Sequence, residues 1–271
     1  DLLFDGYQFM TLDISSSDVI AVGCYRWVET EVIFGSYDGG INWISQMDTI
    51  SESFESVFFV NDTLGYIAGS NFILKTTNSG QDWMVKLDDN SNSLHSIYFT
   101  DENTGYAVGS TYDVGWHKCI LKTTDGGNTW LYVSIGITDD WLLNSVFFVN
   151  RDTGWVAGYG ADFRKTIDGG LSWINQSLGI NGYNDILHSV YFINENIGWV
   201  VGNEGKLFKT TDGGTTWVNK SSPLTSEHLN SVFFINNKFG WIAGENGTVL
   251  HTTNSGAKWL KQTFSTLNNL Y

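Results

Sequence analysis

Short runs of β-branched and aromatic residues, separated by turns rich in Gly, Asn and Asp, repeat along the whole chain. One repeat reads LHSVYF (187–192), GWVVG (198–202), KLFKTT (206–211) and WVNK (217–220). Four apolar runs of this length with polar turns between them predict four antiparallel strands in a meander. The chain has one proline and no long helical pattern, so we expect an all-β protein.

The spacing of the repeats predicts the architecture. A motif ending in tryptophan occurs six times, as SYDGGINW (36–43), TTNSGQDW (76–83), TTDGGNTW (123–130), TIDGGLSW (166–173), TTDGGTTW (210–217) and TTNSGAKW (252–259). Its final tryptophans are 40, 47, 43, 44 and 42 residues apart. Four strands per repeat at this period are typical of β-propeller blades. We therefore expect an all-β propeller of four-stranded antiparallel blades.

Six blades of one propeller are expected within residues 1–271. Their approximate bounds are 1–50, 51–91, 92–139, 140–184, 185–226 and 227–265. The segment LNNLY (267–271) matches the first-strand pattern LNSVF (229–233), so residues 266–271 are expected to start a seventh blade of a longer chain. A closed ring of six blades, with YQFMTLDI (7–14) as the inner strand of the first, stays open as the alternative.

The tryptophan motif is expected to be structural. Its aspartate can accept hydrogen bonds from backbone N–H groups of its own turn, and its glycines permit positive φ values. The tryptophan is expected to pack under the turn. Two copies carry Asn78 and Asn254 instead of aspartate, and asparagine keeps the acceptor without the charge, so the position does not need a catalytic carboxylate. The predicted structural residues are Asp38, Trp43, Asn78, Trp83, Asp125, Trp130, Asp168, Trp173, Asp212, Trp217, Asn254 and Trp259.

The pattern S/T-x-D-G-G-x-T-W resembles the Asp box, or BNR repeat, of sialidases, xyloglucanases and sortilin-type receptors. Together with GW-x-x-G and L-x-S-V-x-F, it most resembles the photosystem II stability/assembly-factor family of propellers, and the resemblance covers almost the whole chain. It implies a propeller fold and favours a protein partner. One fold hosts many activities, so it implies little about chemistry.

The charge balance excludes some partners. The chain has 29 acidic and 14 basic residues, a formal net charge of −15, which argues against nucleic acid and anionic membrane surfaces. No apolar run approaches the ~20 residues of a membrane-spanning helix. Cys24 and Cys119 are expected to be free thiols. We expect no cofactor and no metal, and the acidic, Asn-rich composition suggests an exported bacterial protein.

Binding residues are expected on the end of the blades opposite the boxes. Nine of the 12 tryptophans belong to boxes or to the GW strand, and the other three, Trp27, Trp116 and Trp141, fall in loops at that opposite end. Such insertions commonly mark the binding side of repeat proteins. Aromatic side chains among carboxylates suit a glycan or a basic peptide. The open alternative is that these tryptophans pack the central channel or the long loops. The accompanying predicted residues are Tyr25, Arg26, Glu29, Tyr112, Asp113, His117, Asp139, Asp140, Tyr183 and Asp185.

Catalysis is the alternative function. A sialidase needs three converging arginines, and Arg26, Arg151 and Arg164 do not occupy equivalent blade positions. A xyloglucanase-like pair would have to join Asp139 or Asp140 to Glu29 or Glu204, and the sequence fixes no distance between them. A polar series in the inner strands is expected to be structural rather than a metal site: Glu55, His95, Asn144, His188 and Asn230. We therefore expect a non-catalytic binding propeller, with a glycoside hydrolase as the alternative.

Overall fold

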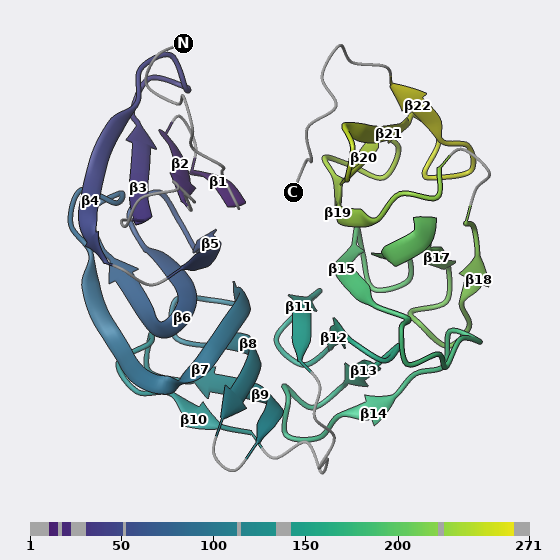
Figure 1. Ribbon diagram of the computed structural model, residues 1–271, viewed down its shortest axis with the longest axis horizontal. Helices are drawn as coiled ribbons and strands as arrows, with labels where there is room; N and C mark the ends of the chain where they lie inside the picture. Colours follow the sequence, from purple (N-terminus) through teal and green to yellow (C-terminus); the bar gives the residue numbers. More distant parts are fainter. Residues whose placement is uncertain are drawn as a thin grey trace. The chain divides into compact units, whose positions relative to one another are not determined.

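The computed structural model describes residues 11–15, 18–22, 31–50, 53–112, 115–133, 142–221 and 225–262. Contacts divide the chain into two compact units, residues 1–140 and 141–271. Apart from one short 3-10 helix, the regular structure within the described residues consists of β-strands paired antiparallel (Figure 1).

The first unit holds two sheets. In the first sheet the strands follow one another in chain order, β1 (Thr11–Ser15), β2 (Asp18–Val22), β3 (Glu31–Ser36) and β4 (Ile44–Ile50). The second sheet has six strands, β5 (Phe54–Phe59), β6 (Gly65–Thr76), β7 (Met84–Phe99), β8 (Gly105–Tyr112), β9 (Trp116–Thr123) and β10 (Leu131–Tyr132). This sheet covers two sequence repeats.

Two expected strand pairs are merged in that sheet. Strand β6 spans the second and third strands of its repeat, with Asn71 at φ 70° between them. Strand β7 joins the outer strand of one repeat to the inner strand of the next without a break. The sequence predicts separate strands here because the boundary between two blades is expected between residues 91 and 92.

The second unit holds three sheets of four strands each, in chain order (Figure 1). They are β11 (Leu143–Phe148), β12 (Gly154–Gly158), β13 (Phe163–Thr166) and β14 (Ile174–Asn175), then β15 (Leu187–Phe192), β16 (Gly198–Gly202), β17 (Leu207–Thr210) and β18 (Val218–Asn219), then β19 (Leu229–Phe234), β20 (Gly240–Gly244), β21 (Thr248–Thr252) and β22 (Leu260–Gln262). The 3-10 helix η1 (Asn203–Gly205) connects β16 to β17. Each of these sheets is one sequence repeat.

Five inner strands, β5, β7, β11, β15 and β19, carry a bulge, whereas the register of β1 against β2 shows none. The register between β15 and β16 shifts between Leu187 and Ser189, which leaves His188 as the extra residue. A bulge leaves one residue outside the ladder and re-aims its side chain. The same shift places Glu55, His95, Asn144 and Asn230 at bulges of the other four strands.

The last glycine of the GW-x-x-G strand is required by this bulge. A Cβ on Gly202 would lie 2.1 Å from the carbonyl oxygen of Ile186, which is too close for any side chain. The core lies between neighbouring sheets. In one cluster Trp155 and Ala157 of β12 pack with Leu187, Val190 and Phe192 of β15, so the second strand of the fourth repeat packs on the first strand of the fifth.

Candidate functional site: the loop end of the sheets

The tryptophan motif closes the turn between the third and fourth strands. In the fourth repeat, the Thr166 hydroxyl donates to Asp168 Oδ1 at 2.8 Å and accepts from the Gly170 N–H. Asp168 Oδ1 also accepts from the Ser172 N–H at 2.9 Å, and the Ser172 hydroxyl donates to Asp168 Oδ2. The carboxylate is therefore occupied by its own turn.

Hydrogen bonding lowers the pKa of this carboxyl. The bonds from Ser172, first through its side chain and then through its backbone, hold the pKa of Asp168 at about 2. Asp38, Asp125 and Asp212 have their pKa lowered to about 2 by the same kind of contacts, with residues Asn42, Thr129 and Thr216. Asn78 and Asn254 accept the corresponding backbone N–H groups from Asp82 and Lys258. A carboxylate with this set of donors is a turn acceptor rather than a general acid.

The motif tryptophans lie against the inner strands. Trp173 meets Phe148 edge-on with ring centres 6.0 Å apart, and Trp217 meets Phe192 in the same way. The pattern recurs for Trp83, Trp130 and Trp259 with Phe59, Phe99 and Phe234. In the first repeat, Trp43 donates its ring N–H to the carbonyl of Gly40.

A lysine three residues before the motif aspartate or asparagine joins neighbouring repeats, and sequence reasoning missed it. Lys165 Nζ donates to the carbonyl of Gly213 in the next motif at 2.7 Å. Lys75 bonds Gly126, and Lys209 bonds Ser255, at the corresponding positions. Burial lowers the pKa of Lys75 and Lys209. The lysine of the K-T box sequence was a visible signal for this contact.

The turns between the second and third strands lie at the end of each sheet opposite the tryptophan motifs, because the strands are antiparallel. In the first unit this end carries the β8–β9 hairpin, in which Tyr112 and Trp116 are paired neighbours. Their ring centres are 5.4 Å apart, and Trp116 is 52% exposed. His117 follows in β9 and is half-buried. The hairpin thus presents an exposed aromatic pair.

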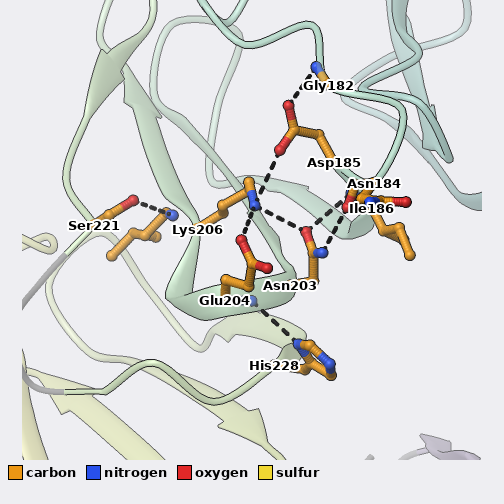
Figure 2. Close-up of polar contacts among 10 residues, drawn as sticks. Gly182, Asn184, Asp185, Ile186, Asn203, Glu204, Lys206, Ser221 and His228 are labelled. Atoms are coloured by element: carbon orange, nitrogen blue, oxygen red, sulfur yellow. Dashed lines mark hydrogen bonds and ion pairs between the residues drawn. The ribbon is translucent and has the colours of Figure 1, made fainter.

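In the second unit the corresponding end is a polar network around Lys206 (Figure 2). Lys206 Nζ lies 3.1 Å from Asp185 Oδ1 and 3.1 Å from Glu204 Oε2. Asn203 Oδ1 accepts from the same ammonium and from the Ile186 N–H, while its amide donates to the Asn184 carbonyl. Lys206 and Asn203 therefore tie the loop before β15 to the turn before β17.

This network holds an exposed tyrosine in place. Asp185 Oδ2 accepts from the Gly182 N–H at 2.6 Å, and the Asp185 N–H donates to the Gly182 carbonyl, so residues 182–185 form a closed turn (Figure 2). Tyr183 lies within that turn and is 72% exposed. Asp185 itself is half-buried and bound to Lys206, so it orients the loop instead of facing solvent as an isolated acid.

Two histidines extend the network to the last sheet of the second unit. His228 Nδ1 accepts from the Glu204 N–H at 3.1 Å (Figure 2), and the rings of His228 and His188 lie 6.3 Å apart. Burial, and then His228, lower the pKa of His188 to about 4. Asn144 donates to the Leu187 carbonyl at the corresponding bulge. Within the described residues no group of three or more His, Cys, Asp or Glu side chains could hold a metal.

Several predicted residues lie outside the described part of the chain. These are Trp27, Trp141, Tyr25, Arg26, Glu29, Asp113, Asp139 and Asp140.

Of the arginines weighed for sialidase chemistry, Arg164 is buried and paired with Asp162 at 2.8 Å, and Arg151 lies in the turn after β11, at the motif end. Cys119 is a buried free thiol, and burial raises its pKa to about 12. Within the described residues no helix is long and apolar enough to cross a membrane.

The model of the family described as Photosynthesis system II assembly factor YCF48 matches residues 84–181 and 176–267. A comparison with curated protein sequences found no match.

Solved structures share the fold. A structure of YCF48 bound to D1 peptide is 20% identical, with a TM-score of 0.73, over 95% of this chain and 83% of that chain. YCF48 from Cyanidioschyzon merolae is 17% identical, with a TM-score of 0.74, over 98% of this chain and 88% of that chain. An ancestral GH74 enzyme is 18% identical, with a TM-score of 0.65, over 80% of this chain and 32% of that chain. The expected propeller fold of four-stranded blades is confirmed.

Proposed function

The chain belongs to the family of the photosynthesis system II assembly factor YCF48, and we propose that it is a non-catalytic module that binds an extended segment of a partner protein. The partner would lie on the loop end of the sheets, opposite the tryptophan motifs. A YCF48 structure that shares the fold is bound to D1 peptide, which supports a peptide as the ligand class.

The observation that carries this proposal is the contrast between the two ends of the sheets. At the motif end, the carboxylate oxygens of Asp168 and its counterparts accept hydrogen bonds from their own turns. At the loop end, Tyr183 and Trp116 are each more than half exposed, Tyr183 on the turn closed by Asp185 and Trp116 beside Tyr112 at the start of β9. Rigid aromatic side chains make good anchors because little conformational entropy is lost when they bind.

Charge favours a basic segment. Lys206 is neutralised by Asp185 and Glu204, while the Glu204 side chain remains 70% exposed. The formal net charge of −15 adds long-range attraction for a cationic partner. A lysine or arginine of the partner would meet the carboxylate of Glu204 and aromatic rings that accept cations on their faces.

A binding titration tests the proposal. Fluorescence polarisation would measure the affinity of a labelled D1 peptide for the parent protein, Tyr183→Ala, Trp116→Ala and Asn103→Ala. We expect the two aromatic variants to weaken binding by about tenfold or more, which is the size of a hot-spot loss. Asn103 lies in the turn before β8, at the motif end, so its variant serves as the control.

Three outcomes would contradict the proposal: no binding of the peptide, equal affinity in all four proteins, or loss confined to Asn103→Ala. Melting temperatures of the same variants should agree within a few degrees, because surface loop changes cost little stability. A glycan panel run beside the peptide tests the sugar alternative that the Tyr112–Trp116 pair favours. Sustained hydrolysis of β-glucans or sialosides would support the glycosidase alternative instead.

A further inference from the structure

Two backbone hydrogen bonds hold the η1 turn against the segments that precede β15 and β19. The Asn203 N–H donates to the Ile186 carbonyl at 3.0 Å, and the Gly205 N–H donates to the Glu227 carbonyl at 2.9 Å. In the preceding repeat the same two bonds run from Tyr159 to Leu142 and from Ala161 to Asp185. These two contacts are therefore part of the repeat.

A third hydrogen bond of η1 uses a histidine side chain as its acceptor. The Glu204 N–H donates to His228 Nδ1 at 3.1 Å (Figure 2). One repeat earlier the position of His228 is occupied by Ile186, whose side chain has no acceptor, so this bond is an addition to the repeat. A ring nitrogen that accepts an N–H carries no proton, so His228 is neutral here, with its proton on Nε2.

The backbone of Glu204 is held in a conformation that glutamate disfavours. Its φ is 54° and its ψ is 36°, in the left-handed region. The corresponding residues of the preceding and following repeats are Gly160 and Asn246, at φ 67° and 51°, and these residue types adopt such angles more readily. A residue in this region persists only where its surroundings hold it, so losing the bond to His228 should loosen η1.

A loosened η1 affects the exposed tyrosine loop through Lys206. The ammonium group of Lys206 lies 3.1 Å from the Glu204 carboxylate and 3.1 Å from the Asp185 carboxylate. Asp185 in turn accepts from the Gly182 N–H and so closes the turn that carries Tyr183. The position of Tyr183 therefore depends on the conformation of Glu204.

Several titratable groups lie on the elements around His228. They are His188 of β15, Glu204 of η1 with Lys206 at its carboxylate, Glu227 beside His228 in the chain, and Glu245, whose N–H donates to the His228 carbonyl. Burial, and then His228, hold the pKa of His188 at about 4. His188 thus stays neutral over most of the range in which an ordinary histidine gains its proton.

We propose that protonation of His228 releases η1 and thereby weakens binding of the partner segment in mild acid. One proton from solvent adds to Nδ1, both ring nitrogens become donors, and the Glu204 N–H loses its acceptor. Histidine changes charge between about pH 8 and about pH 5, so the release falls within that range. The effect on binding rests on the proposed function, whereas the release of η1 does not.

Nitrogen-15 NMR of the free protein tests the release of η1 without any partner. The protein would be labelled at histidine and glutamate, and the signals of His228 and Glu204 would be assigned with the variant His228→Asn. At about pH 8 we expect the His228 proton on Nε2 only, and on acidification we expect the Glu204 amide to shift along the titration curve of the ring. The amide of Glu195, in the motif-end turn after β15, should not follow that curve.

Two NMR results would overturn the release of η1. One is a proton on Nδ1 of His228 at about pH 8, because a protonated nitrogen cannot accept the Glu204 N–H. The other is a Glu204 amide signal that stays constant while the His228 ring titrates.

Binding of labelled D1 peptide to three proteins tests the consequence. In His228→Asn an amide oxygen can take the place of Nδ1 and cannot gain a proton, so its affinity should be similar at about pH 8 and about pH 5.5. The parent should lose about fivefold in affinity over this range, which is the size of one lost hydrogen bond. His188→Asn is the matched control, because it removes the neighbouring histidine and keeps the bond to Glu204, so it should behave as the parent does.

The outcomes separate this inference from the proposed function. The same pH dependence in the parent and in His228→Asn would overturn the effect of His228 on binding. Failure of all three proteins to bind at either pH would contradict the proposed function, and the NMR titration would still decide whether protonation releases η1.

Discussion

Lys165 and Trp155 face each other across the β12–β13 pair, and the ammonium nitrogen of Lys165 lies 5.3 Å from the centre of the Trp155 ring. The same ring stacks on Phe192 of the next sheet at 3.6 Å, and the same ammonium donates to Gly213 in the next motif. Both residues of this cross-strand pair therefore contact the next repeat, Trp155 through its ring and Lys165 through its ammonium group. The pairs Lys75–Tyr66 and Lys209–Trp199 repeat the arrangement.

Replacing Lys165 by methionine should lower the free energy of unfolding by about 1 to 3 kcal/mol. The change keeps an unbranched apolar side chain but removes a charged hydrogen bond and a cation–π contact, which are worth this much together. Urea unfolding would measure the difference. Lys258→Met, at an exposed position, should stay within about 0.5 kcal/mol of the parent. Equal effects of both changes would contradict the role given to Lys165.

In the fourth motif the tryptophan should matter more than the charge. Trp173→Ala should cost roughly 3 kcal/mol or more, because it removes the ring packed on Phe148 and leaves a cavity. Asp168→Asn should cost much less at neutral pH, because Asn78 and Asn254 make the same backbone contacts. Thermal melts of the two variants decide between these roles. Equal and severe losses would show that the carboxylate charge is essential.

Acid should remove the contribution of the motif carboxylates. The pKa of Asp168 is about 2 in the folded protein and near its ordinary value of 3.8 in the unfolded chain. Its stabilising effect is therefore complete above about pH 4 and is lost as the pH falls toward 2. Melting temperatures measured between about pH 5 and 2.5 should fall less steeply in Asp168→Asn than in the parent. Parallel curves would contradict this assignment.

His188 should make the protein less stable in mild acid. Its folded pKa is about 4, below its ordinary value of 6.5, so protonation favours the unfolded chain. Stability is thus retained above about pH 6.5 and is lost as the pH falls toward 4. In His188→Asn, which copies Asn144 and Asn230 at the same bulge, the melting temperature should depend less on pH in this window. A parent protein whose melting temperature is constant there would refute the prediction.

Much of the fold follows from the sequence because the repeat period and the turn residues are local signals. The six motifs place the third turn of every blade, and GW-x-x-G places the second strand. The bulge at His188 is different. There Gly202 lies close to the Ile186 carbonyl, and this contact joins segments distant in sequence, so no local pattern shows it.

At the loop end, the sequence points to exposed aromatic residues but not to the contacts of the acidic ones. Tyr183 and Trp116 stand out because the blade pattern does not require them, and both are exposed. Asp185 looked like an acid available to a ligand, but Lys206 binds it from a different loop. Nothing in the spacing of Asp185 and Lys206 shows that pair, since it depends on how the loop before β15 folds over the turn before β17.

Hydrogen exchange with and without bound D1 peptide tests most directly where the partner lies. We expect slower exchange in the loop-end segments 110–112, 115–118, 180–186 and 203–206 when the peptide is bound. The motif turns, such as 166–173 and 210–217, should exchange at the same rate in both samples. Protection confined to the motif turns, with the loop-end segments unchanged, would contradict the central claim.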